Sequence, residues 1–315
     1  MVTRRIGLLV GRERSFPDAV IAAVGRLTGG RVRCEYAEFE APSAERLVPY
    51  DVLLDRISHE VTCYQPWLKL AALRGCRVIN NPFFRIADDK FFNAGLALDL
   101  GLAVPKTRLL PQKAYAPDIN AASLERTMRH VDWDALEQDL GYPMFLKPHW
   151  GGGWRDVSRI ESRQELYDAY DRSGERPMIL QEGIEFTQYV RCIVIGNQVR
   201  PALWDPRLPH HERYVRAAET MPPLEEALLA RAIDDALTIS QALGYSMNTV
   251  ELAIQNGVPY AIDYMNSAPD LDISSLGEEH FAWAVDTMAQ HLVSLADAPA
   301  QRRASWSALL YEGQR

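Results

Sequence analysis

The chain has 315 residues, of which 47% are hydrophobic and 24% charged, and its formal net charge is −8. The length exceeds one typical domain, and the composition is that of a soluble globular protein with enough apolar residues for a real core. The negative charge gives no general electrostatic support to a nucleic-acid or anionic-membrane partner, and we expect neither.

The beginning of the chain and its cysteines point to a reducing compartment. The first apolar run ends at Gly11, which is too short for a signal sequence and far too short for a membrane span. The 4 cysteines are scattered without a CxxC pair, so neither a disulfide framework nor a zinc site is indicated. We therefore expect free thiols and a cytoplasmic location.

Strand and helix patterns alternate along the first hundred residues. Apolar runs predict strands at residues 6–10, 32–39, 50–54 and 77–80, and helical spacing predicts helices at 18–27 and 66–73. This alternation is typical of a parallel sheet with helices on both faces. Such sheets usually bind ligands at the carboxyl ends of their strands, which makes Arg12, Arg14 and Ser15 candidates for substrate contact. A solvated turn is the simpler explanation of these three residues.

A further helix is predicted at residues 88–100, ending at Gly101, and the polar residues 111–120 indicate a loop. From Gly141 onward the pattern changes to longer apolar strands joined by glycine-rich turns. Helices are predicted among them at 164–170, 224–243 and 278–296. The second half therefore reads as an α+β architecture, different from the first.

The stretch 145–160 has the features of a phosphate-binding loop. A strand delivers Lys147, a turn follows with Gly151, Gly152 and Gly153, and residues 157–160 can return as the partner strand. Glycines let backbone N–H groups approach an anion, and a lysine adds charge, but an ordinary hairpin turn explains the same pattern. Lys90, on the preceding helix, is a second candidate cation, and a solvated helix face is its simpler explanation.

Residues 178–185 form an apolar strand that runs into a polar segment containing Gly183. Such a segment can offer backbone groups to the edge of a purine, with Glu185 near ribose hydroxyls, or it can be only a strand end. Arg191 follows among apolar residues in a hairpin with a Gly196-Asn197 turn. A partly buried arginine needs an anion, either a protein carboxylate or a ligand phosphate.

A second hairpin carries acidic side chains among hydrophobic neighbours. The turn Asn256-Gly257 separates two apolar runs that contain Glu251 and Asp263, and Asn266 follows. Buried carboxylates need a cation or another partner, and a set of oxygen ligands suits Mg²⁺ better than zinc. An ordinary half-exposed hairpin is the alternative, and this stretch alone does not decide between them.

Taken in order, these motifs resemble the ATP-grasp superfamily over roughly residues 5–295. The likeness is greatest to the branch with ribosomal-protein-S6 glutamate ligase-like enzymes, glutathione synthetase and D-alanine–D-alanine ligase. It implies an α/β N-terminal parallel-sheet domain at 1–106, followed by a two-lobed α+β ATP-grasp module. Its central lobe would span 107–185, and its C-terminal lobe, with the metal site and a helical tail, would span 186–315.

The resemblance also implies a role for each candidate residue, with ATP and Mg²⁺ as cofactors. The implied sets are the phosphate-binding Lys90 and Lys147, the loop Gly151, Gly152 and Gly153, the adenine hinge Gln181, Glu182 and Ile184, the ribose-binding Glu185, the catalytic Arg191, Arg213 and Arg216, and the Mg²⁺ ligands Glu251, Asp263 and Asn266. The spacing departs from the family at the last pair, because Asp263 and Asn266 are three residues apart. In a regular strand they would point to opposite faces unless a bulge at 264–265 intervenes.

The activity that the resemblance implies is ATP-dependent ligation of a small-molecule carboxylate to an amine. Such a ligase makes an acyl phosphate, releases ADP and phosphate, and here would form a peptide or amino-acid conjugate. A small-molecule kinase of the same fold and a non-catalytic nucleotide-binding protein are the alternatives. A homodimer is compatible with the resemblance, but no feature of the sequence fixes it.

Overall fold

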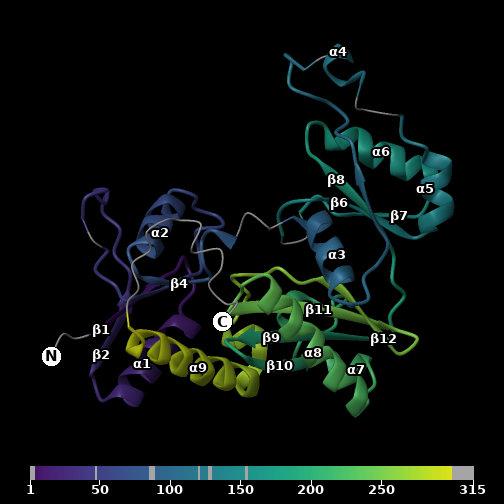
Figure 1. Ribbon diagram of the computed structural model, residues 1–315. Coiled ribbons are helices and arrows are strands. Elements are labelled where there is room, and N and C mark those ends of the chain that lie inside the picture. The colour runs from purple at the N-terminus through teal and green to yellow at the C-terminus, as the bar shows by residue number, and fades with distance from the viewer. Residues whose placement is uncertain are drawn as a thin grey trace. The chain divides into compact units, whose positions relative to one another are not determined.

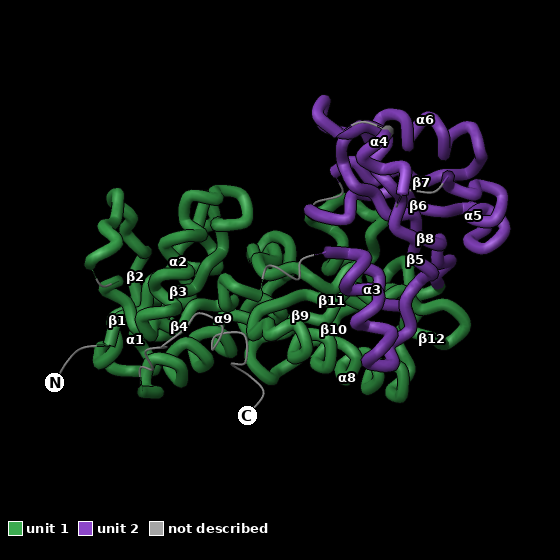
Figure 2. The backbone as a smooth tube through the Cα atoms, turned by 45° about the horizontal axis from the view of Figure 1, so that its top comes forward, with its two compact units in different colours: residues 1–86, 187–259, 263–315 green, residues 87–186, 260–262 purple. Residues whose placement is uncertain are grey.

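The computed structural model describes residues 4–46, 48–84, 89–119, 121–126, 130–152 and 155–299 (Figure 1). The chain divides into two compact units, shown in different colours in Figure 2. The first unit combines residues 1–86, 187–259 and 263–315, and the second combines 87–186 with 260–262. This division into compact units does not test the domain boundaries predicted after residues 106 and 185, and these boundaries stay a prediction.

The N-terminal residues form the predicted parallel sheet. Its strand order is β2-β1-β3-β4, and every neighbouring pair is parallel. The elements are β1 (Arg4–Leu9), α1 (Ser15–Thr28), β2 (Val32–Tyr36), β3 (Val52–Asp55), α2 (Tyr64–Leu73) and β4 (Arg77–Ile79). All six predicted elements are present, with boundaries shifted by at most a few residues.

Helices cover both faces of this sheet. Leu9 and Leu53 pack with Trp67 and Leu68 of α2 on one face. Side chains alternate between the faces of a strand, so Leu8 and Leu54, both almost fully buried, belong to the other face. Helix α1 and the C-terminal helix α9 (Ile273–Asp297) pack against each other, and α9 also contacts β1 and β3 (Figure 1). Helix α9 therefore completes the core around the first sheet.

The second sheet has the strand order β10-β9-β11-β12, with antiparallel pairing of β9 to both β10 and β11. Its elements are β9 (Gln188–Ile195), β10 (Gln198–Leu203), β11 (Met247–Gln255), β12 (Val258–Asp263), α8 (Glu226–Ala242), the short helix α7 (Ala217–Thr220) and the 3₁₀ turn η2 (His210–Glu212). The hairpins predicted around Gly196 and Gly257 are both confirmed. Helix α8 packs on one face, where the Cys192 thiol donates to the carbonyl of Ala232 at 3.6 Å.

The third sheet is antiparallel, with the order β5-β8-β6-β7. Its strands are β5 (Thr107–Leu110), β6 (Met144–Pro148), β7 (Ser158–Ile160) and β8 (Met178–Glu182). The helices of this part of the chain are α3 (Lys90–Asp99), α4 (Ala121–Leu124), α5 (Trp133–Leu140) and α6 (Arg163–Ser173). Met144, Leu146 and Leu180 pack with Leu166 and Tyr170 of α6. Their alternation assigns Phe145, Lys147, Ile179 and Gln181 to the opposite face of the sheet.

The structure adds two findings on sequence expectations. No helix among the described residues is long and apolar enough to cross a membrane. The four cysteines are all free, as predicted, although Cys63 is exposed whereas Cys76 and Cys192 are buried.

Candidate active site

In the second unit, the predicted phosphate-binding residues meet around the glycine loop. The backbone N–H of Lys90 donates to the carbonyl of His149 at 2.8 Å, and the Lys90 ammonium group donates to the carbonyl of Gly151. Gly151 has φ = +103°, a conformation that a side chain disfavours. Lys90 thus lies against the loop rather than on a solvated helix face. Gly152 continues the loop, and Gly153 lies outside the described residues.

Asp89 fixes the start of helix α3 beside this loop. Its carboxylate accepts the backbone N–H groups of Phe91 and Phe92 at 2.9 and 3.0 Å, and it also pairs with the His149 ring. Burial opposes its ionisation, but the Phe92 N–H and the His149 ring outweigh burial and hold the pKa of Asp89 below its usual value. An N-cap of this kind orients the first turn, and therefore Lys90.

Lys147 and Gln181 lie on the face of the third sheet that α5 and α6 leave uncovered. Lys147 is a buried residue of β6 and stands opposite Ile179 of β8. Gln181 is buried in β8, and its amide donates to the hydroxyl of Thr107 at 2.9 Å. The sheet therefore places a buried lysine and the predicted hinge strand on one surface.

The predicted hinge begins where β8 ends. The Glu182 N–H donates to the carbonyl of Lys106 at 2.9 Å, and the Glu182 carboxylate accepts the Lys106 N–H at 3.1 Å. A side chain at Gly183 would stand 2.4 Å from the carbonyl oxygen of Pro143, so this close backbone approach requires glycine. Ile184 is half-buried and Glu185 exposed, both beyond the strand.

In the first unit, Arg191 and Glu251 are direct cross-strand partners on β9 and β11. The Arg191 Nε and the Glu251 Oε1 are 3.5 Å apart, and Arg191 also donates to the Thr249 hydroxyl at 3.1 Å. The Tyr189 hydroxyl donates to the other Glu251 oxygen at 3.0 Å. Cys192 faces α8, so these odd-numbered residues occupy the face that α8 leaves uncovered.

Aromatic rings support the arginines of this cluster. The guanidinium carbon of Arg191 lies 5.2 Å from the ring centre of Trp204 and 5.9 Å from that of Tyr214. Arg213 stacks over the same Trp204 ring at 5.1 Å, and its Nε donates to the carbonyl of Leu208 at 3.0 Å. Two arginines therefore share one buried tryptophan.

Arg216 has different surroundings from Arg213. It forms ion pairs with Glu212 at 2.5 Å and with Glu219 at 2.9 Å, and its side chain is about half exposed. Two protein carboxylates thus already neutralise its charge. Of the two predicted arginines, the structure brings Arg213 to the cluster and engages Arg216 in surface ion pairs.

Two acidic side chains of the cluster lie close enough for their charges to interact. Burial raises the pKa of Glu251 to about 7, Arg191 opposes this shift, and the negative charge of Asp263 adds to it. The Arg191 Nε is buried and has no hydrogen-bond partner among the residues that the structure describes. No group of three or more acidic, histidine or cysteine residues among the described residues forms a metal cage. Two carboxylates and an amide nevertheless fit Mg²⁺, which usually takes its remaining ligands from phosphates and water.

The two predicted metal ligands spaced three residues apart lie in different elements, because Asp263 ends β12 and Asn266 follows in a loop. Strand β12 ends at Asp263, so strand alternation does not extend to Asn266 and no bulge within the strand is needed. Asn266 lies in a loop whose backbone N–H donates to the Asn248 side chain at 2.8 Å. The expectation that Asp263 and Asn266 point to opposite faces therefore does not apply.

Other candidates from the sequence lie elsewhere. The Ser15 hydroxyl donates to Asp272 at 2.6 Å, and Arg14 stacks over Tyr36.

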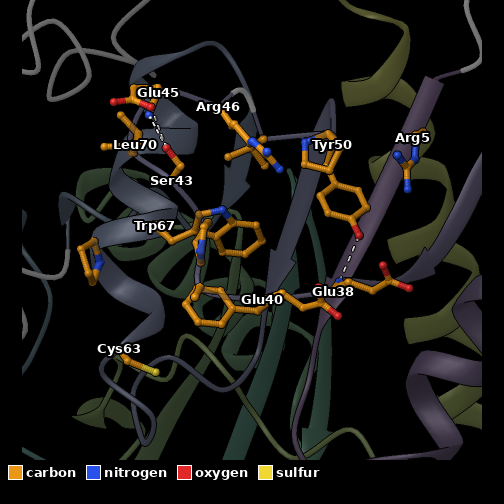
Figure 3. Close-up of a pocket in the computed structure, with 17 residues that line it drawn as sticks. Arg5, Glu38, Glu40, Ser43, Glu45, Arg46, Tyr50, Cys63, Trp67 and Leu70 are labelled. Atoms are coloured by element: carbon orange, nitrogen blue, oxygen red, sulfur yellow. Dashed lines mark hydrogen bonds between the residues drawn. The ribbon is translucent and has the colours of Figure 1, made fainter.

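A cavity of about 1150 Å³ lies between the loop after β2 and helix α2, with Trp67 and Tyr50 in its lining (Figure 3). The Tyr50 hydroxyl there accepts the N–H of Glu38 at 3.1 Å. None of the predicted site residues that the structure describes lines this cavity.

Sequence reasoning missed Tyr189, Trp204, Tyr214 and Asn248. Tyr189 precedes Arg191 by two residues in one strand, so a period of two could have placed it on the same face. Trp204 and Tyr214 fall within the polar, proline-rich segment that follows β10, where no periodic pattern indicates which side chains turn inward.

The segment carrying Trp204 and Arg213 is held by Asp205. The Asp205 carboxylate is almost fully buried and accepts two hydrogen bonds from the Arg207 guanidinium at 2.8 Å and one from the Thr220 hydroxyl at 2.7 Å. The Arg207 contact lowers the pKa of Asp205 to about 2. A depressed pKa contributes stability that is present above the unfolded value and is lost as pH falls through the folded value.

Replacing Asp205 by Asn is therefore expected to lower the free energy of unfolding at pH 7 by about 1–2 kcal/mol. The difference from the wild type should narrow as pH falls from 4 toward 2. Denaturant unfolding at a series of pH values measures both effects. A difference that stays constant over this range would show that ionisation of Asp205 is not its source.

Comparison with known proteins finds similarity to named ligases. No family model matches the chain. A D-alanine–D-alanine ligase from Clostridium botulinum is 25% identical over 173 residues, which are 50% of this chain and 53% of that protein. The chain thus spans about half the length of the curated relatives it matches.

Solved structures extend the likeness over most of the chain. A RimK domain ATP-grasp protein from Sphaerobacter thermophilus has a TM-score of 0.63 at 19% identity, covering 92% of this chain and 99% of its own. The ATP complex of a D-alanine–D-alanine ligase from Bacillus anthracis has a TM-score of 0.61 at 16% identity, covering 93% and 96%. The chain has the ATP-grasp fold. The resemblance predicted from the ordered motifs is confirmed, and in sequence the chain is similar to D-alanine–D-alanine ligases.

Proposed function

We propose that this protein is an ATP-dependent ligase that joins a small-molecule carboxylate to an amine through an acyl phosphate. The observation that carries the proposal is the cluster of the buried Arg191 and the half-buried Glu251, with Arg213 stacked on the Trp204 ring beside Arg191 and Asp263 close enough to shift the Glu251 pKa. A buried arginine beside an acid of raised pKa provides opposite charges that can bind a phosphate and its cation. The fold, and similarity to proteins named as ligases, support the same class.

In the proposed reaction, a carboxylate oxygen attacks the γ-phosphorus of ATP, and the bond to the bridging oxygen of ADP breaks. The amine nitrogen then attacks the acyl carbon, and phosphate leaves with the original carboxylate oxygen. Phosphoryl transfer of this kind needs alignment and charge neutralisation, and no covalent enzyme nucleophile is required.

We assign the triphosphate to Lys90, Lys147 and the glycine loop. Lys90 already contacts the loop, so closure of the loop and placement of this charge would occur together. Backbone groups from Gln181 to Ile184 would hold adenine, and Glu185 the ribose. Excluding water at this site protects an acyl phosphate from hydrolysis.

Arg191 would neutralise charge on the transferring phosphoryl group. The Trp204 ring below it restricts its guanidinium, so little rotamer freedom remains to be lost on binding. Arg213, on the same ring, would bind the substrate carboxylate or the oxyanion of the tetrahedral intermediate. Arg216 suits this role less well, because its guanidinium group already forms ion pairs with Glu212 and Glu219.

Glu251, Asp263 and Asn266 would hold Mg²⁺. When bound, the ion supplies positive charge to the phosphate oxygens and lowers the barrier to phosphoryl transfer. The residues themselves contribute oxygen ligands, and a bound cation would offset the effect of burial and of Asp263, which disfavour the ionised form of Glu251. The substrates are a small carboxylate and an amine. The cytoplasmic location and any homodimer stay predictions.

The test is turnover of MgATP with pooled amino acids and small carboxylates, using hydroxylamine as a surrogate amine. Mass spectrometry reads the nucleotide product and any hydroxamate together. ADP plus a hydroxamate is expected and identifies the acid. A stable phosphate ester would favour the kinase alternative, and ATP binding without any turnover would favour a non-catalytic nucleotide-binding protein.

Replacing Asp263 by Asn is expected to raise the Mg²⁺ concentration for half-maximal turnover by about 10-fold or more, because one anionic ligand is lost. Asp171→Asn is the matched control, since Asp171 is an exposed carboxylate on α6 that pairs with Lys113. An Mg²⁺ titration equal to that of the wild type would remove Asp263 from the metal site.

A further inference from the structure

Asn248 is a fully buried residue of β11 with three hydrogen bonds. Its amide nitrogen donates to the Ser240 hydroxyl on α8 at 3.0 Å and to the carbonyl of Tyr264 at 2.9 Å. Its amide oxygen accepts the backbone N–H of Asn266 at 2.8 Å. None of these contacts is predicted by the motif that contains Glu251, three residues further along the strand.

The side-chain amide of Asn248 pairs with the backbone of the loop after β12, as a neighbouring strand would do within a sheet. Beyond Asp263 the chain leaves the sheet. Without Asn248, the carbonyl of the buried Tyr264 and the N–H of the partly buried Asn266 would lose these hydrogen bonds. An amide offers one donor side and one acceptor side, like a peptide unit. It binds the loop on both sides of Met265 and thereby fixes the path of the chain at Asn266.

This clamp acts from the opposite face of the sheet to the charge cluster. Asn248 bonds to α8 through Ser240, whereas Glu251, an odd number of positions away, lies on the face with Arg191. Strand β11 therefore carries the proposed metal ligand Glu251. It also carries Asn248, which orients the loop with the second proposed ligand, Asn266. The backbone of β11 fixes the distance between Asn248 and Glu251.

We infer that Asn248 is a positioning residue for the proposed metal site, because it sets the position of Asn266 relative to Glu251. The inference rests on the proposed function, since it concerns the same cation. It explains how a pair of ligands spaced three residues apart serves one site without a bulge in β12. Asn248 itself does not touch the cation.

Asn80 provides a matched control within the same unit. It is also a buried asparagine whose side chain pairs with backbone, donating to the carbonyl of Met247 at 2.7 Å and accepting the N–H groups of Ser246 and Met247 at 2.9 and 3.0 Å. It holds the beginning of β11, not the loop after β12. Replacing either asparagine by alanine removes a comparable set of hydrogen bonds.

The experiment measures Mn²⁺ binding by electron paramagnetic resonance in the presence of a non-hydrolysable ATP analogue, with thermal unfolding of each variant. Asn248→Ala is expected to weaken Mn²⁺ binding by about 10-fold or more. Asn80→Ala should lose thermal stability to a similar extent while keeping the wild-type Mn²⁺ affinity. Asn248→Ser, whose one hydroxyl cannot bond both loop groups, should fall between wild type and Asn248→Ala and serves if the alanine variant does not fold.

Equal Mn²⁺ affinity in wild type and the folded Asn248 variants would overturn the positioning role alone. Equal losses in the Asn80 and Asn248 variants would also overturn it, because they would show a general effect of destabilisation. Absence of Mn²⁺ binding by the wild type would instead overturn the proposed function, and the inference with it.

Discussion

Replacing Lys147 by methionine is expected to weaken MgATP binding by at least about 100-fold, because the charge that we propose to pair with a phosphate is lost. Lys147 is buried in β6, on the sheet face that carries Gln181 and away from α6. Methionine has a similar length and keeps the packing, so the fold should be retained. Calorimetric titration with MgATP and circular dichroism measure the two effects.

Lys113→Met is the control for this change. Lys113 also lies in the second unit, but it is partly exposed and pairs with Asp171. Exposed ion pairs contribute little, so this variant should bind MgATP like the wild type. Unchanged nucleotide affinity in Lys147→Met would remove Lys147 from the phosphate site.

Replacing Glu251 by glutamine is expected to lower turnover by at least about 100-fold without lowering stability. Burial raises the pKa of Glu251 to about 7. A raised carboxyl pKa contributes stability below the unfolded value near 4.5, and this contribution is lost as pH rises through about 7. At pH 8 the wild type therefore carries the cost of an ionised carboxylate that Arg191 offsets only in part, whereas glutamine is neutral and can still accept the Tyr189 hydroxyl hydrogen.

The measurement compares turnover and thermal unfolding at pH 8, with the unfolding done in the absence of divalent cations. Asp235→Asn makes the corresponding change in another buried acid, one on α8 that pairs with Arg231 and has a pKa raised by burial. This control should keep wild-type turnover. A clearly lower unfolding midpoint in Glu251→Gln, with turnover intact, would mean that Glu251 serves only as a structural partner of Arg191.

The local elements of the fold were predictable because their signals lie within short stretches. The six elements of the first sheet, the turn at Asn256-Gly257 and the strand carrying Lys147 all follow from periodicity and turn residues. Strand β5 and helix α5 were missed, since both fall in a polar region where no clear apolar period stands out. The start of α9 was placed too late, at residue 278, because Gly277 interrupts the helical backbone with φ = +74°.

The assembly of the site was less accessible to sequence reasoning. Arg191 and Glu251 were each proposed, but their direct pairing joins strands separated by the whole of α8. Lys90 and Gly151 likewise meet across about sixty residues. Such pairings depend on tertiary packing, whereas single-strand patterns report only which side chains share a face. The order of the motifs along the chain therefore predicted the ATP-grasp resemblance, whereas the distances between site residues required the structure.

The most direct test of the central claim follows one oxygen atom. The carboxylate identified by the hydroxamate experiment is labelled with ¹⁸O in its carboxyl group and incubated with MgATP, the protein and the amine. Mass spectrometry then reads the inorganic phosphate. An acyl phosphate predicts one ¹⁸O in each phosphate released with ADP and one lost from the product. Unlabelled phosphate, or AMP as the nucleotide product, would contradict the proposed ligase.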